Sequence, residues 1–193
     1  MSDKIILVCG FGRCGSSLVM QMLYSAGIGM NGTPPYYELE GTRSPEWIAN
    51  QHGRAIKILE PHRHGWKFNP ADYAVIWLDR DYSEMAKSHV KFQTSKRGVG
   101  VANQRGSRKH LVKWFKQQRP IATKLCESLG PTLYLRFQDL LSQPNTCAIR
   151  LAQHCGIDRD CIEAMASAVF SRTPEARPTL DLELKLEGVR NER

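Results

Sequence analysis

No run of apolar residues in this sequence is long enough to span a bilayer, and no apolar leader stands at its start. Residues 1–4 lead directly into a short run of apolar residues with branched side chains. They do not form the charged, apolar and small-residue regions of a secretory signal peptide. These absences predict a soluble, cytoplasmic protein that makes no use of a membrane.

Cysteine pairs of the kind that bind zinc or exchange electrons are also missing. The six cysteines include no C-x-x-C pair and no Cys/His spacing of a zinc site. They are predicted to be reduced thiols, most of them small core residues, and no metal is expected. Cys14 is the exception, because a thiol at a helix N-terminus beside Arg13 is expected to have a lowered pKa and to react with electrophiles.

Acidic residues are in the minority. The chain has 19 Asp and Glu against 27 Lys and Arg, which gives a net charge of +8 and a pI near 9.3. This balance favours anionic ligands, of which nucleic acid is one class and a phosphorylated cofactor another. With 41% hydrophobic and 24% charged residues the composition excludes disorder and fibrous repeats, and 193 residues suit one core but not two domains.

The most informative stretch lies near the start, where residues 4–27 read KIILVCGFGRCGSSLVMQMLYSAG. A short apolar run predicts a buried strand, and apolar residues at helical spacing after Ser17 predict a helix, so the glycines between them form a strand-loop-helix unit. Such a loop binds anions through backbone N–H groups and the helix dipole. Ser16 and Ser17 add hydroxyl donors, and Arg13 adds a charge-assisted hydrogen bond.

One residue of the common phosphate-binding loop is absent from this stretch. Gly10 and Gly15 have the spacing of the pattern G-x-x-x-x-G-K-[ST], but Ser16 stands where the lysine should be. The cation, Arg13, comes before the last glycine instead. The sequence therefore predicts an anion site that lacks the usual lysine contact to the β- and γ-phosphates of ATP.

Strands and helices alternate along the rest of the chain. Further strands are predicted at residues 55–60, 74–78 and 132–137, and further helices at residues 81–91, 111–129, 145–155 and 159–170. We expect Pro120 to break or kink its helix, and residues 94–109 to form a mobile basic loop.

This alternation predicts an α/β fold, namely a three-layer α/β/α sandwich with a central, mainly parallel sheet of the P-loop nucleotide-binding type. The expected domain covers residues 1–173. Residues 174–193 are expected to form a C-terminal arm that docks on it or adds an edge strand.

Polar residues follow the predicted strands at the ends where the chain leaves them. They are Glu60, His62 and His64 after the second strand, and Asp79 and Arg80 after the third. Because the carboxyl ends of parallel strands meet at one edge of a sheet, we expect these residues and the glycine loop to share a site. Ser88 lies eight residues after Arg80, so both are placed to bind a further phosphate. The alternative for Arg80 is an ion pair with Asp81 or Glu84.

Three segments together resemble the sulfotransferases that use 3′-phosphoadenosine 5′-phosphosulfate (PAPS). Residues 12–18, GRCGSSL, are similar to the 5′-phosphosulfate loop, usually written [PG]-[KR]-S-G-[TS]-[TS]. Residues 75–92, VIWLDRDYSEMAKSHVKF, are similar to the 3′-phosphate element, a strand ending in Arg with Ser eight residues later. Residues 133–157 resemble the later strand and helix, and the three segments follow the order of the family.

The resemblance implies PAPS as sulfuryl donor, in-line transfer to a hydroxyl or amine, and adenosine 3′,5′-bisphosphate as product. It implies eight cofactor-binding residues: Gly12, Arg13, Cys14, Gly15, Ser16, Ser17, Arg80 and Ser88. A preorganised cation and N–H donors would stabilise the charge that develops on the bridging oxygen of the 5′-phosphate, with no metal required. The glycine- and lysine-rich adenine clamp of some members is not evident, and we expect the basic loop from Lys96 to Lys109 to fold over the nucleotide instead.

The acceptor needs a base, a role that contributes on the order of 10²–10⁴ in rate. The segment KILEPH, which begins at Lys57, resembles a family segment K-T-H-x-P, but Leu59 occupies the position of the histidine. Glu60 and His62 are then the nearest candidates for the base, with Glu60 favoured. Glu38 is a third candidate and is also expected to contact the acceptor, and Lys57 is expected to support the leaving phosphate.

Two other functions compete with this one. A P-loop nucleotide kinase is suggested by residues 75–79, which form a strand that ends in a potential metal-binding aspartate, although the loop lysine is missing. A nucleic-acid-binding module is suggested by the net charge and the basic run at residues 96–113, but no motif with interleaved aromatic residues supports it. The expected partner is a small-molecule or glycan acceptor, and the sequence does not indicate an oligomeric state.

Overall fold

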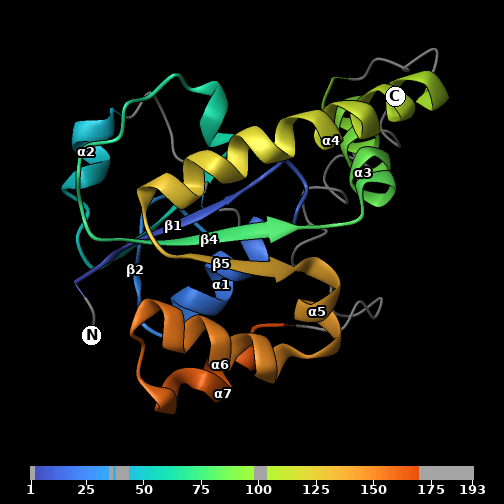
Figure 1. Ribbon diagram of the computed structural model, residues 1–193. Coiled ribbons are helices and arrows are strands. Elements are labelled where there is room, and N and C mark those ends of the chain that lie inside the picture. The colour runs from blue at the N-terminus through green and yellow to red at the C-terminus, as the bar shows by residue number, and fades with distance from the viewer. Residues whose placement is uncertain (1–2, 35–36, 38–43, 98–103, 170–193) are drawn as a thin grey trace.

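In the computed structural model (Figure 1), the first strand, β1 (Ile5–Gly10), lies in the middle of the five-stranded sheet that the described residues form. All six of its residues are buried, as expected for an apolar run with helices on both faces. β3 (Arg54–Leu59) and β4 (Tyr73–Asp79) flank it, and β2 (Gly29–Met30) and β5 (Thr132–Arg136) form the edges. Every pairing is parallel, in the order β2-β3-β1-β4-β5.

The structure describes residues 3–34, 37, 44–97 and 104–169. The predicted C-terminal arm at residues 174–193 and the candidate Glu38 lie outside these ranges. Among the residues that are described, no helix is long and apolar enough to cross a membrane.

Helices cover both faces of the sheet and complete three layers (Figure 1). α1 (Ser16–Ser25), α6 (Pro144–Cys155) and α7 (Ile162–Ser167) pack below it in this view, and α4 (Gln104–Leu129) packs above it. α3 (Tyr82–Arg97) packs on α4, beyond the end of β4. The shorter helical segments are α2 (Pro45–Ala49), η1 (Pro61–Arg63), α5 (Phe137–Ser142) and η2 (Arg159–Cys161). The predicted fold class is confirmed, and all strand pairings in the described part of the chain are parallel.

The predicted mobile loop at residues 94–109 was largely wrong. α3 continues to Arg97 and α4 already begins at Gln104. The loop had been expected because these residues lack an apolar period, but Lys, Arg and Gln are good helix formers and extend helices whose other turns are held by packing. The basic segment that was expected to fold over a nucleotide therefore consists mostly of two helix ends, with residues 98–103 between them outside the described ranges.

Pro120, which was predicted to break or kink its helix, does not break it. α4 is a single helix from Gln104 to Leu129 with Pro120 inside it. Pro120 has no N–H to donate to the carbonyl oxygen of Lys116, four residues earlier. Because Pro120 lies on the exposed side of the helix, water can donate to this oxygen instead. The opposite face buries Phe115, Ala122 and Cys126, and this apolar stripe holds both halves of the helix against the sheet.

The chain leaves β1 and β4 toward different parts of the molecule. α1 follows β1 on one face of the sheet, whereas β4 leads into α3, which packs on α4 of the other face (Figure 1). Ligands of open parallel sheets bind where neighbouring strands lead to opposite faces, outside the carboxyl ends of the strands. Gly10, the last residue of β1, is in register with Leu59 of β3 and Leu78 of β4, so the three strands end at one level.

His154 makes the stability of this fold depend on pH. Its Nε2 donates to the carbonyl oxygen of Val75 in β4 over 2.8 Å, and burial lowers the pKa of its imidazole. An unfolded histidine takes up a proton near pH 6.5, while folded His154 stays neutral to a lower pH. The unfolded state then binds more protons, so the stability falls as the pH falls below about 6.5.

We expect urea unfolding to give a smaller free energy of unfolding at pH 5 than at pH 7.5. His154→Gln keeps a donor but does not titrate, so this variant should lose less stability than the parent over the same pH interval. An identical pH dependence in the two proteins would exclude His154 as a contributor.

Candidate functional site

The site is built on the loop between β1 and α1, residues 11–15, here called the β1–α1 loop. Its first residue, Phe11, is buried with its ring centroid 5.5 Å from that of Trp77 and 5.2 Å from that of Phe115, so the loop is anchored in the core. The N–H of Cys14 donates to the carbonyl of Phe11 over 3.2 Å and closes the turn. Arg13 adopts a left-handed φ of 72°, a strained conformation that is frequent at functional sites.

Gly15 is the residue that lets the loop pass into α1. It caps the helix with φ 104°, and a Cβ at this position would lie 2.4 Å from the ring of Phe137. Its N–H and that of Gly12 donate to no group within the described part of the chain. The N–H of Gly15 lies at the start of α1, where the helix dipole favours negative charge.

Two arginines and a serine meet beside this loop. The Nε of Arg13 donates to the Oγ of Ser88 in α3 over 3.0 Å, and the guanidinium lies 5.0 Å from the centre of the Phe92 ring. The Nη1 of Arg80 donates to the carbonyl oxygen of Arg13 over 3.2 Å. The structure thus brings together the glycine loop, Arg80 and Ser88, which the sequence placed up to 75 residues apart.

Arg80 also makes the ion pair that was considered as its alternative role. Its Nε lies 3.4 Å from the Oε2 of Glu84, and its guanidinium lies 4.4 Å from the centre of the Phe137 ring. The side chain is only 10% exposed. The ion pair with Glu84 and the contact with the Phe137 ring therefore fix the orientation of the Arg80 side chain against the loop.

A third cation lies at the start of α1. Lys57 projects from β3, is 5% exposed, and its Nζ donates to the Oγ of Ser17 over 3.3 Å. An ammonium group in this position strengthens the attraction of the helix N-terminus for an anion, because the surrounding protein screens charge less than water does. Ser16, also predicted to bind the anion, is buried at the first position of α1.

The prediction for Cys14 was wrong. Burial raises the pKa of the Cys14 thiol to about 11, although the backbone and side chain of Ser16 and the charge of Lys57 act in the opposite direction. The thiol is fully buried, so desolvation of the thiolate outweighs the helix terminus. The prediction that most cysteines are core residues is confirmed, since five of the six are buried.

Glu60 and His62 lie where β3 ends. Glu60 has a left-handed φ of 52°, its N–H donates to the carbonyl of Gly10 over 2.8 Å, and its Oε2 accepts from Nη1 of Arg63 over 2.7 Å. The Nε2 of His62 lies 3.1 Å from the Oε1 of Gln118, and its buried Nδ1 has no partner among the described residues. Burial lowers the pKa of His62, so the imidazole is neutral at pH 7.

His89 was not among the predicted site residues, yet the fold places it against the loop. Its buried Nδ1 lies 3.7 Å from the position a Cβ on Gly12 would take, and this nitrogen has no hydrogen-bond partner among the described residues. Burial lowers the pKa of the imidazole, Glu60 opposes this shift, and Arg13 adds to it. The only signal in the sequence was that His89 follows Ser88, which does not tell which face of the helix His89 lies on.

Asp79 and His64 are directed elsewhere. Asp79 accepts from Arg119 through both oxygens, at 3.0 and 2.6 Å, and from the Nε1 of Trp77 at 3.0 Å. The Nε2 of His64 lies 3.1 Å from the carbonyl of Leu59, and its ring stacks on Trp66. The carboxylate that a kinase would use to bind a metal is therefore occupied by an arginine. Among the described residues no group of three or more His, Cys, Asp or Glu side chains could hold a metal ion.

Comparison with known proteins adds to this geometry. No family model matches the chain, and no curated protein matches it. Among solved structures, sulfotransferase STF1 from Mycobacterium tuberculosis H37Rv superposes with a TM-score of 0.52, at 12% identity, over 99% of this chain and 76% of that one. The chain has a sulfotransferase-like fold. At this identity the likeness concerns the fold, so the function has to be argued from the residues of the site.

Gly15→Ala is expected to destabilise the protein by about 1–3 kcal/mol, because the new Cβ would meet the Phe137 ring at 2.4 Å and the left-handed φ of 104° strains any side chain. Denaturant unfolding measures the loss. The matched control is Gly65→Ala, where φ is 66° and no atom lies within 4 Å of the new Cβ, so only the backbone strain is added.

Phe137→Leu in the Gly15→Ala background should recover part of the lost stability. Equal losses for Gly15→Ala and Gly65→Ala, with no recovery in the double variant, would contradict the contact.

Proposed function

We propose that this protein is a sulfotransferase that moves a sulfuryl group from PAPS to a hydroxyl or amine of an acceptor. The observation that carries the proposal is the hydrogen bond from Arg13 to Ser88, together with the bond from Arg80 to the carbonyl of Arg13. These contacts make the glycine loop and the start of α3 one cationic surface. Such a surface suits a nucleotide that carries phosphate at both the 5′ and the 3′ position.

The two phosphate groups would be bound by different elements. On this proposal the N–H groups of Gly12 and Gly15 and the hydroxyl of Ser17 bind the 5′-phosphosulfate, with the charge of Lys57 close by. Arg80 and Ser88 bind the 3′-phosphate. The sulfotransferase-like fold supports this assignment, since it presents the loop after β1 and the residues after β4 at one edge of the sheet.

PAPS supplies the transferred group: the acceptor oxygen or nitrogen forms a bond to sulfur while the bond from sulfur to the bridging oxygen breaks and its electron pair leaves with adenosine 3′,5′-bisphosphate. Arg13 and the N–H donors of the β1–α1 loop stabilise the charge that grows on that oxygen. Lys57 contributes a second cation on the β3 side. These groups are held by the fold before the reaction starts, so no reorganisation is needed when the charge appears.

Glu60 is the base that we propose for the acceptor proton. It follows β3 next to the end of β1, and the hydrogen bond from its N–H to Gly10 fixes it there in a strained backbone conformation. Its carboxylate is close enough to His89 to affect the pKa of the imidazole. His62 and His89, both neutral at pH 7, are the alternative proton acceptors on this side of the loop.

Adenosine 3′,5′-bisphosphate is expected to raise the melting temperature more than ATP with Mg²⁺ does. Arg80→Gln and Ser88→Ala should each weaken its binding by about tenfold to a hundredfold, the usual range for hydrogen bonds to a charged group, as measured by calorimetry. Adenosine 5′-phosphosulfate lacks the 3′-phosphate, so its affinity should change much less.

Arg159→Gln is the matched control for this experiment, since Arg159 is an exposed arginine in η2. Equal losses for the two nucleotides would remove the 3′-phosphate assignment. A larger thermal shift with ATP and Mg²⁺ would support a kinase instead.

Glu60→Gln is expected to reduce turnover by on the order of 10²–10⁴ while the affinity for adenosine 3′,5′-bisphosphate is unchanged, because a base acts only on the acceptor proton. The measurement is transfer of labelled sulfate from PAPS. His62→Asn and His89→Asn are assayed in parallel. Full turnover in Glu60→Gln and a loss in one histidine variant would move the role of base to that histidine.

A further inference from the structure

α4 carries a row of exposed cations on a side that faces away from the sheet. The helix packs on the sheet through Phe115, Ala122 and Cys126 (Figure 1). Five exposed cations lie on its other side, namely Arg105, Lys109, Lys113, Lys116 and Lys124. The helical period of 3.6 residues places them within an arc of about 100° and along about 28 Å of the helix. We call this row the α4 basic stripe.

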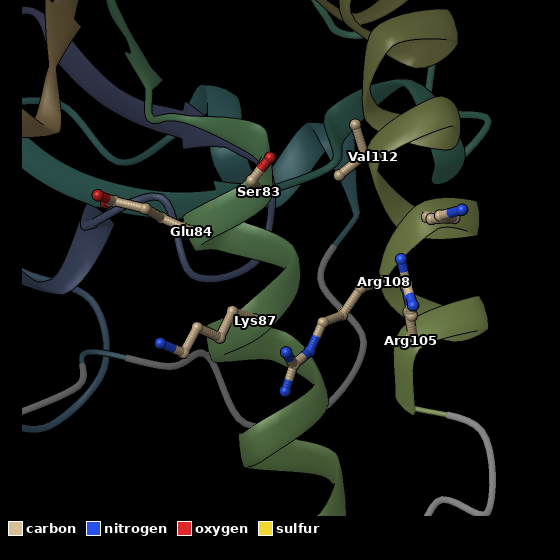
Figure 2. Close-up of a pocket in the computed structure, with 7 residues that line it drawn as sticks. Ser83, Glu84, Lys87, Arg105, Arg108 and Val112 are labelled. Carbon is tan, nitrogen blue, oxygen red and sulfur yellow. The ribbon is translucent and has the colours of Figure 1, made fainter.

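No carboxylate neutralises the α4 basic stripe. Within the described ranges, none of its five cations forms an ion pair. The single acidic residue of α4, Glu127, accepts a hydrogen bond from the hydroxyl of Tyr134. Where α3 packs on α4, the charged ends of Glu84 and Lys87 are directed away from α4 (Figure 2), and the carboxylate of Glu84 pairs with Arg80 over 3.4 Å. The stripe therefore keeps its full positive charge.

The charges of the stripe act against the stability of their own helix. Lys109 lies four residues from both Arg105 and Lys113, and Lys116 follows three residues after Lys113. Like charges at these spacings destabilise a helix. A helix face that only contacts water usually alternates charges of opposite sign, which stabilise it. A row of one sign is instead a feature of surfaces that bind anionic partners, because the partner offsets the repulsion.

The residue types of the stripe favour a lipid surface over nucleic acid. Four of its five cations are lysines, which act as point charges, whereas arginine is the residue that recognises individual phosphates through two hydrogen bonds. The exposed residues in the described part of α4 include no Phe, Tyr or Trp on which a nucleobase would stack. The stripe therefore suits a diffuse negative potential better than a chain of separate phosphates.

An exposed apolar side chain beside the stripe points to the same partner. Ile121 is 55% exposed and lies three residues before Lys124, so the two side chains are neighbours on the helix surface. Pro120, in the middle of the stripe, is exposed as well. Apolar side chains next to cations enter the boundary between the head groups and the acyl chains of a membrane. A nucleic-acid backbone offers them no such apolar environment.

We propose that the α4 basic stripe binds the surface of a membrane that contains anionic lipids, with the cations at the head groups and Ile121 at the acyl boundary. The proposal is independent of the proposed function, because none of the five cations belongs to the candidate site. Binding of this kind needs no helix that spans the bilayer. It differs from the expectation that the protein makes no use of a membrane, which rested on apolar runs and leader segments alone.

Cosedimentation with vesicles tests the proposal. In about 0.1 M salt, vesicles of phosphatidylcholine with about 30% phosphatidylserine should bind the protein, and vesicles of phosphatidylcholine alone should not. Lys113→Gln with Lys116→Gln should weaken this binding by about tenfold to thirtyfold, because each cation near an anionic surface raises the affinity by about fivefold. The matched control, Lys67→Gln with Arg159→Gln, removes the same charge from exposed positions outside α4 and should change binding by at most about twofold.

Ile121→Ser tests the apolar contact separately. It should weaken binding to the phosphatidylserine vesicles by about threefold or more, because a polar side chain gains nothing from the acyl boundary. The matched control is Ile149→Ser, since Ile149 is 41% exposed on α6, on the other face of the sheet (Figure 1). Equal effects of the two substitutions would contradict the assignment of the lipid contact to α4.

Three further results would overturn the proposal: equal binding of the two kinds of vesicle, equal losses in the two double variants, or release of the protein from the vesicles by single-stranded DNA at an equal concentration of negative charge. The last result would assign the stripe to nucleic acid. The Lys113 and Lys116 double variant should melt at or above the temperature of the parent, because it relieves the repulsion. A lower melting temperature would contradict the repulsion on which the proposal rests.

Discussion

The hydrogen bond between Arg13 and Ser88 joins the β1–α1 loop to α3 at the candidate site. Arg13 belongs to the β1–α1 loop, which is anchored in the core by the buried side chain of Phe11. Ser88 belongs to α3, which follows β4, so the bond joins the segments that follow two neighbouring strands of the sheet. Arg80 reinforces it by binding the carbonyl of Arg13. Without these contacts the loop would be only a turn between a strand and a helix.

Much of the fold could be predicted because its signals are local. The continuous apolar runs of β1 and β4 and the glycines before α1 are short-range patterns. The helix caps are local too, since the side chains of Ser44 and Asp81 accept from the backbone N–H groups of Trp47 and Glu84, each three residues later. β2 is a two-residue strand and has no such pattern. The helix ends at residues 94–109 were missed because their stability comes from neighbouring turns rather than from their own sequence.

The side-chain pairings of the site were less predictable. The sequence placed Asp79 at a strand end but gave no sign of Arg119, 40 residues away, which takes both of its oxygens. The thiol of Cys14 was expected to respond to the helix terminus, whereas its pKa is governed by burial, which depends on the packed structure. The place of His89 in the site could not be predicted for the same reason, because packing decides which face of a helix points toward the loop. Residue types could be inferred, but their partners could not.

Phe137, which packs on the site, is synthesised later than the residues of the site that it contacts. Its ring packs on Gly15 and on the guanidinium of Arg80, although it lies at the junction of β5 and α5, well after both in the sequence. During synthesis the ribosome releases the N-terminal segments first. The loop and the start of α3 therefore emerge before the residue that holds them, and the cationic surface is completed only after Phe137 has been added to the chain. A nascent chain that ends before β5 has the anion-binding residues but not the support that fixes them.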